Sequence, residues 1–152
     1  MYAGGVERGT VDIAAAIAAR GWTALVASGG GPMVREVLRV GATHITIPLN
    51  TRNPLLYRRN GNLLVNLVRD HGVDLIHARS RAPAWSSVRA ARITGVPLVT
   101  TFHGTYGADS ALKRHYNSAM LRGDRVIAIS RFIAGHIRTN YQKFDDSKLV
   151  TI

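Results

Sequence analysis

The chain has 152 residues, of which 46% are hydrophobic and 19% charged, a composition that suits one globular domain with a sizeable core and excludes a disordered chain. It has no cysteine, so disulfides and thiolate metal sites are excluded. Its 20 Lys and Arg residues against 9 Asp and Glu residues give a formal net charge of +11. Such a field favours anionic partners, although a GC-rich genome would also raise the arginine content.

No stretch approaches the apolar length of a membrane-spanning helix, and the first residues lack a secretory signal pattern. We therefore expect a cytoplasmic domain.

Short β-branched runs alternate with longer helical patterns along the chain. The expected strands are Trp22–Ala27, His44–Ile47, Asp74–Ala78, Val96–Phe102, Arg125–Ile129 and Leu149–Ile152. The expected helices run from the Gly4 loop to Gly21, from Pro32 to Val40, from Pro54 to Asp70, from Pro83 to Thr94, from Ser110 to Leu121, and from an N-cap at Ser130 to Tyr141. The later strands are almost entirely apolar, which is typical of parallel sheets covered by helices.

This alternation predicts an α/β fold with an open, doubly wound, mostly parallel sheet and helices on both faces. The sequence opens on Met-Tyr-Ala-Gly-Gly, a turn that normally follows a first strand, and closes inside the apolar run 149–152. We therefore expect a piece of a longer protein from which the first strand is missing.

Ligands of doubly wound sheets bind at the carboxyl ends of the strands, on the loops that lead into helices. The candidate loops are 4–8, 29–32, 78–83, 103–109 and 130–131.

The first loop carries the paired glycines Gly4 and Gly5 at the start of a helix. Its backbone amides could meet a phosphate, or the pair could form a tight turn without a ligand. The loop matches neither a dinucleotide fingerprint nor a P-loop.

His103 follows a buried apolar strand directly and precedes Gly104, which predicts an imidazole at the ligand crevice. An imidazole can donate to a sugar hydroxyl or move protons near neutral pH, whereas the alternative is a histidine that only ends the strand.

The neighbouring strand ends in Arg79, Ser80 and Arg81, which suit a phosphate or an anionic sugar. The alternative is an ordinary solvated loop. We expect His77 and Trp85 to serve the core.

Residues 52–59 mix basic, aliphatic and aromatic side chains at a helix start. This stretch, like Lys113, Arg114 and His115, is either a surface that contacts an anionic membrane or a solvated helix face.

Three segments together resemble glycosyltransferase family 4, whose members have the GT-B fold of two Rossmann-like domains. They are GGVERGTVDIAAAIAARGW, DLIHARSRAPAWSSVRAARITGVPLVTTFHG and GDRVIAISRFIAGHI, and they span nearly the whole chain. The variant with HARSRAPAW and VTTFHGTYG looks most like bacterial enzymes of lipopolysaccharide-core or exopolysaccharide assembly.

The resemblance implies that residues 1–152 form the N-terminal, acceptor-side domain of a retaining enzyme that moves a sugar from a nucleotide-sugar donor to a glycan or glycolipid. It implies that Gly4 and Gly5 lie near the donor diphosphate and acceptor, and that His103 is the catalytic histidine that contacts the transferred sugar. Gly104, Thr105, Arg79, Ser80 and Arg81 would line the substrate site, and Ser130 and Arg131 would face the cleft. It implies no bound metal and no further cofactor.

The C-terminal domain, which grips the donor in this family, is missing from the sequence. We therefore expect negligible turnover from the 152-residue chain alone.

Two other functions stay open. A GT-B sugar-nucleotide epimerase would need carboxylates in the crevice, where the candidate loops offer only Glu7 and Asp109. A module that binds nucleic acid or an acidic polysaccharide would suit the charge, but the basic residues are scattered and no nucleic-acid-binding motif is present, so we expect no nucleic acid partner. A dehydrogenase lacks its glycine fingerprint.

The sugar-transfer interpretation depends on one geometric expectation. The amides of Gly5 and the imidazole of His103 should converge on the same crevice at the strand ends.

Overall fold

The computed structural model describes residues 1, 4–51 and 53–152. Tyr2 and Ala3 of the opening turn, and Arg52 of the basic stretch 52–59, lie outside the described residues. The chain forms two compact units, Met1–Thr51 and Arg52–Ile152. Each has its own parallel sheet.

The first unit is built from two helices and two strands. They are α1 (Gly5–Ala18), β1 (Leu25–Ser28), α2 (Val34–Arg39) and β2 (Thr43–Thr46). The strands pair in parallel, with Leu25 beside Thr43 and Ser28 beside Thr46. The apolar side chains of α1 and α2 meet in a small buried cluster that includes Val11 and Val37. Among the described residues no strand precedes α1.

The second unit holds the remaining elements. They are α3 (Pro54–Asp70), β3 (Ile76–Ala78), α4 (Arg81–Thr94), β4 (Leu98–Phe102), α5 (Ala111–Asn117), the 3₁₀ turn η1 (Ser118–Leu121), β5 (Arg125–Ala128), α6 (Arg131–Asn140), the 3₁₀ turn η2 (Asp146–Lys148) and β6 (Leu149–Thr151). Its four strands are all parallel and follow one another in chain order, β3-β4-β5-β6.

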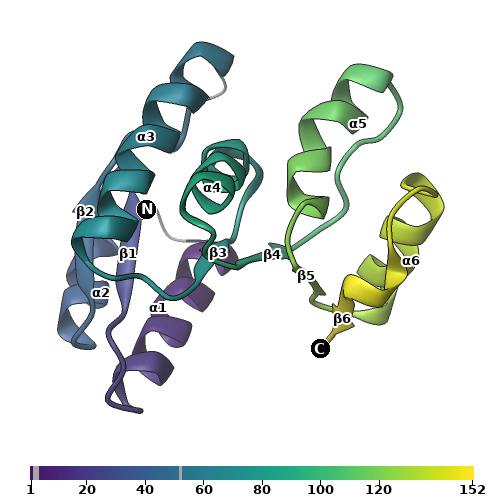
Figure 1. Ribbon diagram of the computed structural model, residues 1–152. Helices are drawn as coiled ribbons and strands as arrows, with labels where there is room; N and C mark the ends of the chain where they lie inside the picture. The colour runs from purple at the N-terminus through teal and green to yellow at the C-terminus, as the bar shows by residue number, and fades with distance from the viewer. Residues whose placement is uncertain (2–3, 52) are drawn as a thin grey trace. The chain divides into compact units, whose positions relative to one another are not determined.

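Right-handed crossovers between successive parallel strands bring the connecting helices to one side of a sheet. Figure 1 shows this arrangement, with α4, α5 and α6 on the same side of the four strands. Phe102, Val126 and Ala128 are fully buried beneath these helices, together with Met120 and Ile137. The nearly continuous apolar runs of the sequence therefore become the covered strands that they predict.

The longest helix, α3, begins as its sequence predicts. Asn53 caps it by accepting a hydrogen bond from the Leu55 N–H at 3.0 Å, and Pro54 occupies its first turn. It packs closely against α4, where Gly61 is buried beside the Arg89 side chain. A second link joins the same helices, because the Ser86 hydroxyl donates to the Tyr57 carbonyl at 3.2 Å.

The predicted α/β fold with parallel strands is confirmed. The strands differ from the prediction in dividing between two sheets. Two of them, β3 and β4, begin two residues later than predicted, and β1 begins three residues later. The predicted helix 110–121 ends at Asn117 and continues as the tighter turn η1. Of the helices in the described part of the chain, none combines the length and hydropathy needed to cross a bilayer.

Candidate functional site

Three neighbouring strands of the second unit end at one edge of its sheet. Ala78 of β3 pairs with Thr100, and Phe102 of β4 pairs with Ala128 of β5. Because the strands are parallel, the loops that follow them begin side by side. Arg79–Ser80, His103–Ser110 and Ile129–Ser130 are these loops, so the structure brings the predicted residues of the second unit to a common edge.

His103 is the first residue beyond β4 and is half-buried. It follows Phe102, which is fully buried, so the strand fixes the position of its backbone. Arg79 and His103 both lie close enough to His77 to oppose its protonation, and Arg79 carries a positive charge. The edge of β3 and β4 is therefore electropositive around His103.

His77 serves the packing of the sheet, as expected from the sequence. Its Nε2 atom lies 2.7 Å from the Oγ1 atom of Thr101 on the neighbouring strand. Burial, with smaller contributions from neighbouring Arg79 and His103, lowers the pKa of His77 to about 4. His77 is therefore neutral near pH 7, and the positive charge of this edge comes from the arginines.

The turn between β3 and α4 carries three predicted residues with different surroundings. Ser80 is the extended N-cap of α4, but its hydroxyl makes no capping hydrogen bond. The Arg81 guanidinium lies 4.4 Å from the centre of the Tyr106 ring, and its Nη1 donates to Oδ1 of Asn117 at 3.3 Å. Arg81 therefore already has partners within the fold, whereas Ser80 presents a hydroxyl at the start of a helix.

In the turn between β5 and α6 the serine does cap the helix, unlike Ser80. Oγ of Ser130 accepts a hydrogen bond from the Ile133 N–H at 3.2 Å and caps α6, which confirms the predicted N-cap. Arg131 is the first residue of that helix and is exposed.

Three residues that the sequence analysis did not select hold the loop beyond His103. The Tyr106 N–H donates to Nε2 of His136 on α6 at 3.3 Å, and Nδ2 of Asn117 donates to the Gly107 carbonyl at 2.9 Å. The Tyr106 ring also stacks on Phe102, with 4.9 Å between ring centres. The two hydrogen bonds join residues 30 and 10 positions apart in the sequence, so no local pattern predicts them.

Gly104 and Thr105 form the part of this loop next to His103. A methyl group built on Gly104 would meet no atom within 4 Å, and the residue does not have a positive φ. Neither fold geometry nor packing therefore requires a glycine there, and the open space suits the close approach of a ligand. Thr105 is exposed beside it.

Trp85 belongs to the packing of the unit, as expected. Its Nε1 donates to the Tyr116 carbonyl at 3.1 Å, and the Arg122 guanidinium lies 4.8 Å from its ring centre.

Gly4 and Gly5 belong to the first unit, where Gly4 is the extended N-cap of α1 and Gly5 is its first residue. A methyl group on Gly5 would meet no atom within 4 Å. Gly4 and Gly5 are exposed, and the Glu7 carboxylate lies beside Gly4, where a methyl group on Gly4 would come within 2.7 Å of Oε2. Their convergence with His103 stays a prediction.

Within the described residues, no group of three or more His, Cys, Asp or Glu side chains is arranged to hold a metal ion. The strand-end edge of the second unit presents the imidazole of His103, the hydroxyls of Ser80 and Thr105, and the charge of the arginines. It also presents the backbone amides at the starts of α4 and α6. This set suits a ligand with both hydroxyl groups and negative charge.

Parallel strands with ligand-binding groups at their carboxyl ends define a Rossmann-like α/β domain. The chain belongs to Glycosyltransferase Family 4, whose family model matches residues 3–152. The resemblance stated from the sequence is thereby confirmed.

Among solved structures, the chain is similar to a glycosyltransferase from Rickettsia africae ESF-5, with 40% identity and a TM-score of 0.85 over 100% of this chain and 41% of that one. It is similar in fold to Anabaena Alr3699/HepE in complex with UDP and glucose, with 21% identity and a TM-score of 0.75 over 98% of this chain and 40% of that one. A putative UDP-N-acetylglucosamine 2-epimerase from Listeria monocytogenes shares the fold at 12% identity, with a TM-score of 0.66 over 97% of this chain and 42% of that one. No curated protein matches the sequence.

Each of these chains is therefore more than twice as long as the part that this chain matches. The likeness covers one Rossmann-like half of a GT-B architecture.

Proposed function

We propose that residues 1–152 form the N-terminal, acceptor-side domain of a retaining glycosyltransferase. The protein would transfer a hexosyl group from a nucleotide-sugar donor to a lipopolysaccharide or polysaccharide acceptor. The observation that carries this proposal is the position of His103, half-buried at the end of β4 and held on a tethered loop, in a chain of this family.

In this proposal His103 is the catalytic residue. Its imidazole would contact the transferred sugar and stabilise the charge that develops as the bond to the diphosphate breaks. Gly104 and Thr105 would border the sugar, and Ser80, Arg79 and Arg81 would bind acceptor oxygens. Gly4 and Gly5 would supply amides near the donor diphosphate, and Ser130 and Arg131 would face the cleft.

The nature of the donor is supported by the relatives. The Anabaena structures contain UDP with glucose or UDP-glucose, so a UDP-sugar is the first donor to test. The donor-gripping groups would belong to a second domain outside residues 1–152. For that reason we expect the 152-residue chain alone to show negligible turnover, and measurable sugar transfer by it would contradict this part of the proposal.

An epimerase is the principal rival, because two epimerases share the fold at 12% and 13% identity. Epimerisation needs acid and base groups at the sugar. In the described stretch 53–152, the strand-end loops 79–80, 103–110 and 129–130 contain one carboxylate, Asp109, which is exposed and bound by Lys113 at 2.8 Å. The other candidate carboxylate, Glu7, lies beside Gly4 in the first unit, so within the second unit the strand-end loops favour transfer to an acceptor.

The test is product analysis with the full-length protein. UDP-glucose labelled at C1 is incubated with and without a lipopolysaccharide-core oligosaccharide, and the products are resolved by NMR. The proposal predicts an α-linked glycoside that forms only with acceptor. A β-linked product would contradict retention, and a C2 epimer of the donor formed without acceptor would establish the rival.

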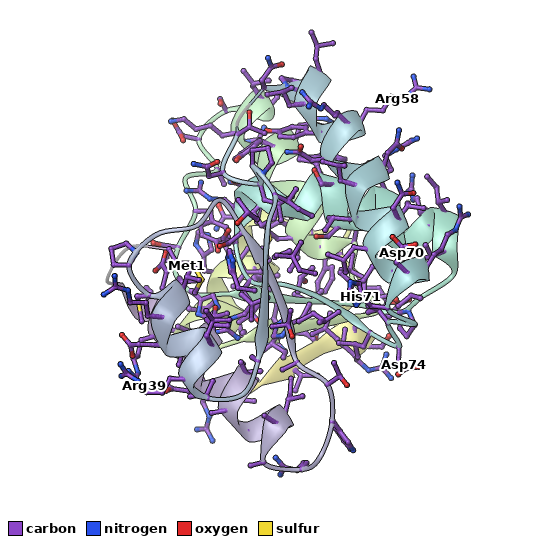
Figure 2. All side chains as sticks on the ribbon, turned by 90° about the vertical axis from the view of Figure 1, so that its left-hand side faces the viewer. Met1, Arg39, Arg58, Asp70, His71 and Asp74 are labelled. Atoms are coloured by element: carbon purple, nitrogen blue, oxygen red, sulfur yellow. The ribbon has the colours of Figure 1, made fainter. Side chains whose placement is uncertain are left out.

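We also propose that the start of α3 contacts an anionic membrane surface. Leu55 is 83% exposed, and Arg58 and Arg59 are exposed on the same helix. In Figure 2 the Arg58 side chain extends outward from α3. An exposed apolar side chain with two cations on the next turn of the helix is a pattern of peripheral membrane binding.

Sedimentation with vesicles tests this contact. Vesicles with phosphatidylglycerol should carry the protein down, vesicles of phosphatidylcholine alone should not, and Arg58→Ala with Arg59→Ala should weaken the binding severalfold. Equal sedimentation of the variant and the parent would contradict the proposal.

A further inference from the structure

A groove lies on the second unit beside α5. It has a volume of about 710 Å³ and lies between α5–η1 on one wall and the segment from Thr139 to Lys148 on the other. Figure 1 shows α5 and α6 facing each other across this part of the unit. None of His103, Arg79, Arg81 or Arg131 lines it. Ala108, in the loop beyond His103, is the one lining residue that also belongs to a strand-end loop, so the groove adjoins that loop but does not include the candidate side chains.

The groove is strongly cationic. Arg114, Arg122, Lys143 and Lys148 line it, against the single carboxylate of Asp145. Among the described residues none of these four cations forms an ion pair. Four positive charges against one carboxylate in the lining of the same hollow attract an anion.

The other two carboxylates nearby are hydrogen-bonded by cations that do not line the groove. Asp109 is bound through both oxygens by Lys113, and Asp146 is bound through both oxygens by Arg138. Neither of these two cations lines the groove. Asp109 and Asp146 are therefore bound by cations outside the groove, and within the described part of the chain the four cations of the lining are left without a close ion pair.

Asp145, the one acid in the lining, is also engaged. It accepts hydrogen bonds from the Ser147 hydroxyl at 2.6 Å and the Ser147 N–H at 3.1 Å, which lower its pKa, with a smaller contribution from the charge of Lys148. It stays ionised, and the net charge of the lining is positive.

The two arginines on the α5 wall are held in place by the fold. The Arg114 guanidinium donates to the Ala108 carbonyl at 2.6 Å through Nη1, and Arg122 lies 4.8 Å from the centre of the Trp85 ring. A guanidinium has five N–H donors, so each keeps donors for a ligand. Oxyanions such as phosphate match this donor geometry better than other anions do.

The remaining lining adds hydrogen-bonding and flat apolar surface. Gln142 and Thr139 contribute an exposed amide and hydroxyl, and Tyr141 contributes a half-buried ring. A groove of this volume is in the usual size range of small-ligand sites, about 300–1,000 Å³. Polar groups around an aromatic ring suit a saccharide, whose hydroxyls need partners and whose ring faces are apolar.

We propose that the groove between α5 and the Thr139–Lys148 segment binds a phosphorylated saccharide. The cations on both walls hold the phosphate, and Gln142, Thr139 and Tyr141 contact the sugar. This site goes beyond the proposed glycosyl transfer and does not depend on it.

Isothermal titration of the full-length protein with glucose 6-phosphate tests the proposal. We expect saturable binding that is weaker by about tenfold or more in Lys143→Ala with Lys148→Ala, because two charged hydrogen-bond donors are lost. Lys143→Gln alone, at an exposed position, should weaken binding severalfold. Inorganic phosphate should bind more weakly than the sugar phosphate, and glucose should not bind.

The matched control is Arg35→Ala with Arg39→Ala, which removes the same net charge from exposed positions on α2 of the first unit. Its affinity should equal that of the parent, and thermal unfolding should confirm that all variants fold. Three results would overturn the proposal. They are no binding of glucose 6-phosphate, equal weakening in both double variants, or equal affinity for inorganic phosphate.

Discussion

Nδ2 of Asn117 donates to the carbonyl of Gly107 at 2.9 Å, and this bond fastens the loop beyond His103 to the end of α5. Oδ1 of the same side chain accepts from Arg81, so one buried amide joins the loop, α5 and the start of α4. With the bond from the Tyr106 N–H to His136, it gives His103 a fixed environment. The geometry of the candidate site therefore depends on hydrogen bonds of the loop that follows His103.

Removing this amide should cost stability and loosen the loop. Asn117 is 1% exposed, and Asn117→Ala leaves the Gly107 carbonyl and the Arg81 guanidinium without their partner, for a loss of about 1–3 kcal/mol in the free energy of unfolding. Hydrogen exchange of residues 103–109 should accelerate. Asn62→Ala is the control, since Asn62 is exposed and binds only Arg89, and it should cost about 0.5 kcal/mol or less. Equal losses in the two variants would contradict the role of the Asn117 tether.

His77 predicts a pH dependence of stability. Its pKa in the folded protein is about 4, lowered from 6.5, so the unfolded chain binds a proton more readily. The stability that depends on neutral His77 is fully present above pH 6.5. It is lost as the pH falls towards 4, so the free energy of unfolding decreases with acidity. A fall in the pKa from 6.5 to about 4 corresponds to about 3.4 kcal/mol in the free energy of unfolding, and partial exposure reduces this to about 2 kcal/mol.

Urea unfolding of the parent and of His77→Gln between pH 7 and pH 4 measures this contribution. The stability of the parent should fall more steeply with acidity than that of the variant. His71→Gln, at an exposed position after α3, should follow the parent. Parallel curves for all three proteins would show that His77 does not titrate as described.

The two serines at helix starts should behave differently. Ser130 caps α6 through its hydroxyl, whereas the Ser80 hydroxyl does not cap α4. Ser130→Ala should therefore cost about 1 kcal/mol of stability and Ser80→Ala about 0.5 kcal/mol or less. If Ser80 binds acceptor oxygens, its variant should raise KM for the acceptor at unchanged stability. A larger loss of stability in Ser80→Ala than in Ser130→Ala would contradict these assignments.

Gly61 and Gly135 offer a similar comparison within helices. A methyl group on Gly61 would come within 2.6 Å of Cδ and 3.1 Å of Cβ of Arg89, whereas one on Gly135 would meet no atom within 4 Å. Gly135→Ala should stabilise the protein by about 0.5–1 kcal/mol through helix propensity. Gly61→Ala should lose that gain or destabilise, because α3 and α4 must separate to admit it. Chemical denaturation measures the free energy of unfolding of both variants. An equal increase for both would show that α3 and α4 admit the methyl group on Gly61 without cost.

Much of the second unit could be predicted from its sequence. The apolar runs that end at Ala78 and Phe102 gave the covered strands, and Asn53-Pro54 gave the start of α3, because these signals act over a few residues. The placement of His103 after a buried strand followed from the same local pattern.

Other features could not be predicted in this way. The partition of the strands into two sheets depends on hydrogen bonds between distant segments, which no local pattern encodes. The same holds for Tyr106, Asn117 and His136, whose partners lie 10 to 36 residues away. The groove is another such feature. The sequence shows how many cations the chain has, but only the structure shows that Asp109 and Asp146 are paired with other cations.

The catalytic role of His103 is the central claim, and steady-state kinetics of His103→Ala in the full-length protein test it most directly. With UDP-glucose and a lipopolysaccharide-core acceptor, kcat should fall by about 100-fold or more while KM for the donor and the unfolding temperature change little. His71→Ala, remote in sequence and exposed, should keep the activity of the parent. Activity of His103→Ala within about threefold of the parent would contradict the account.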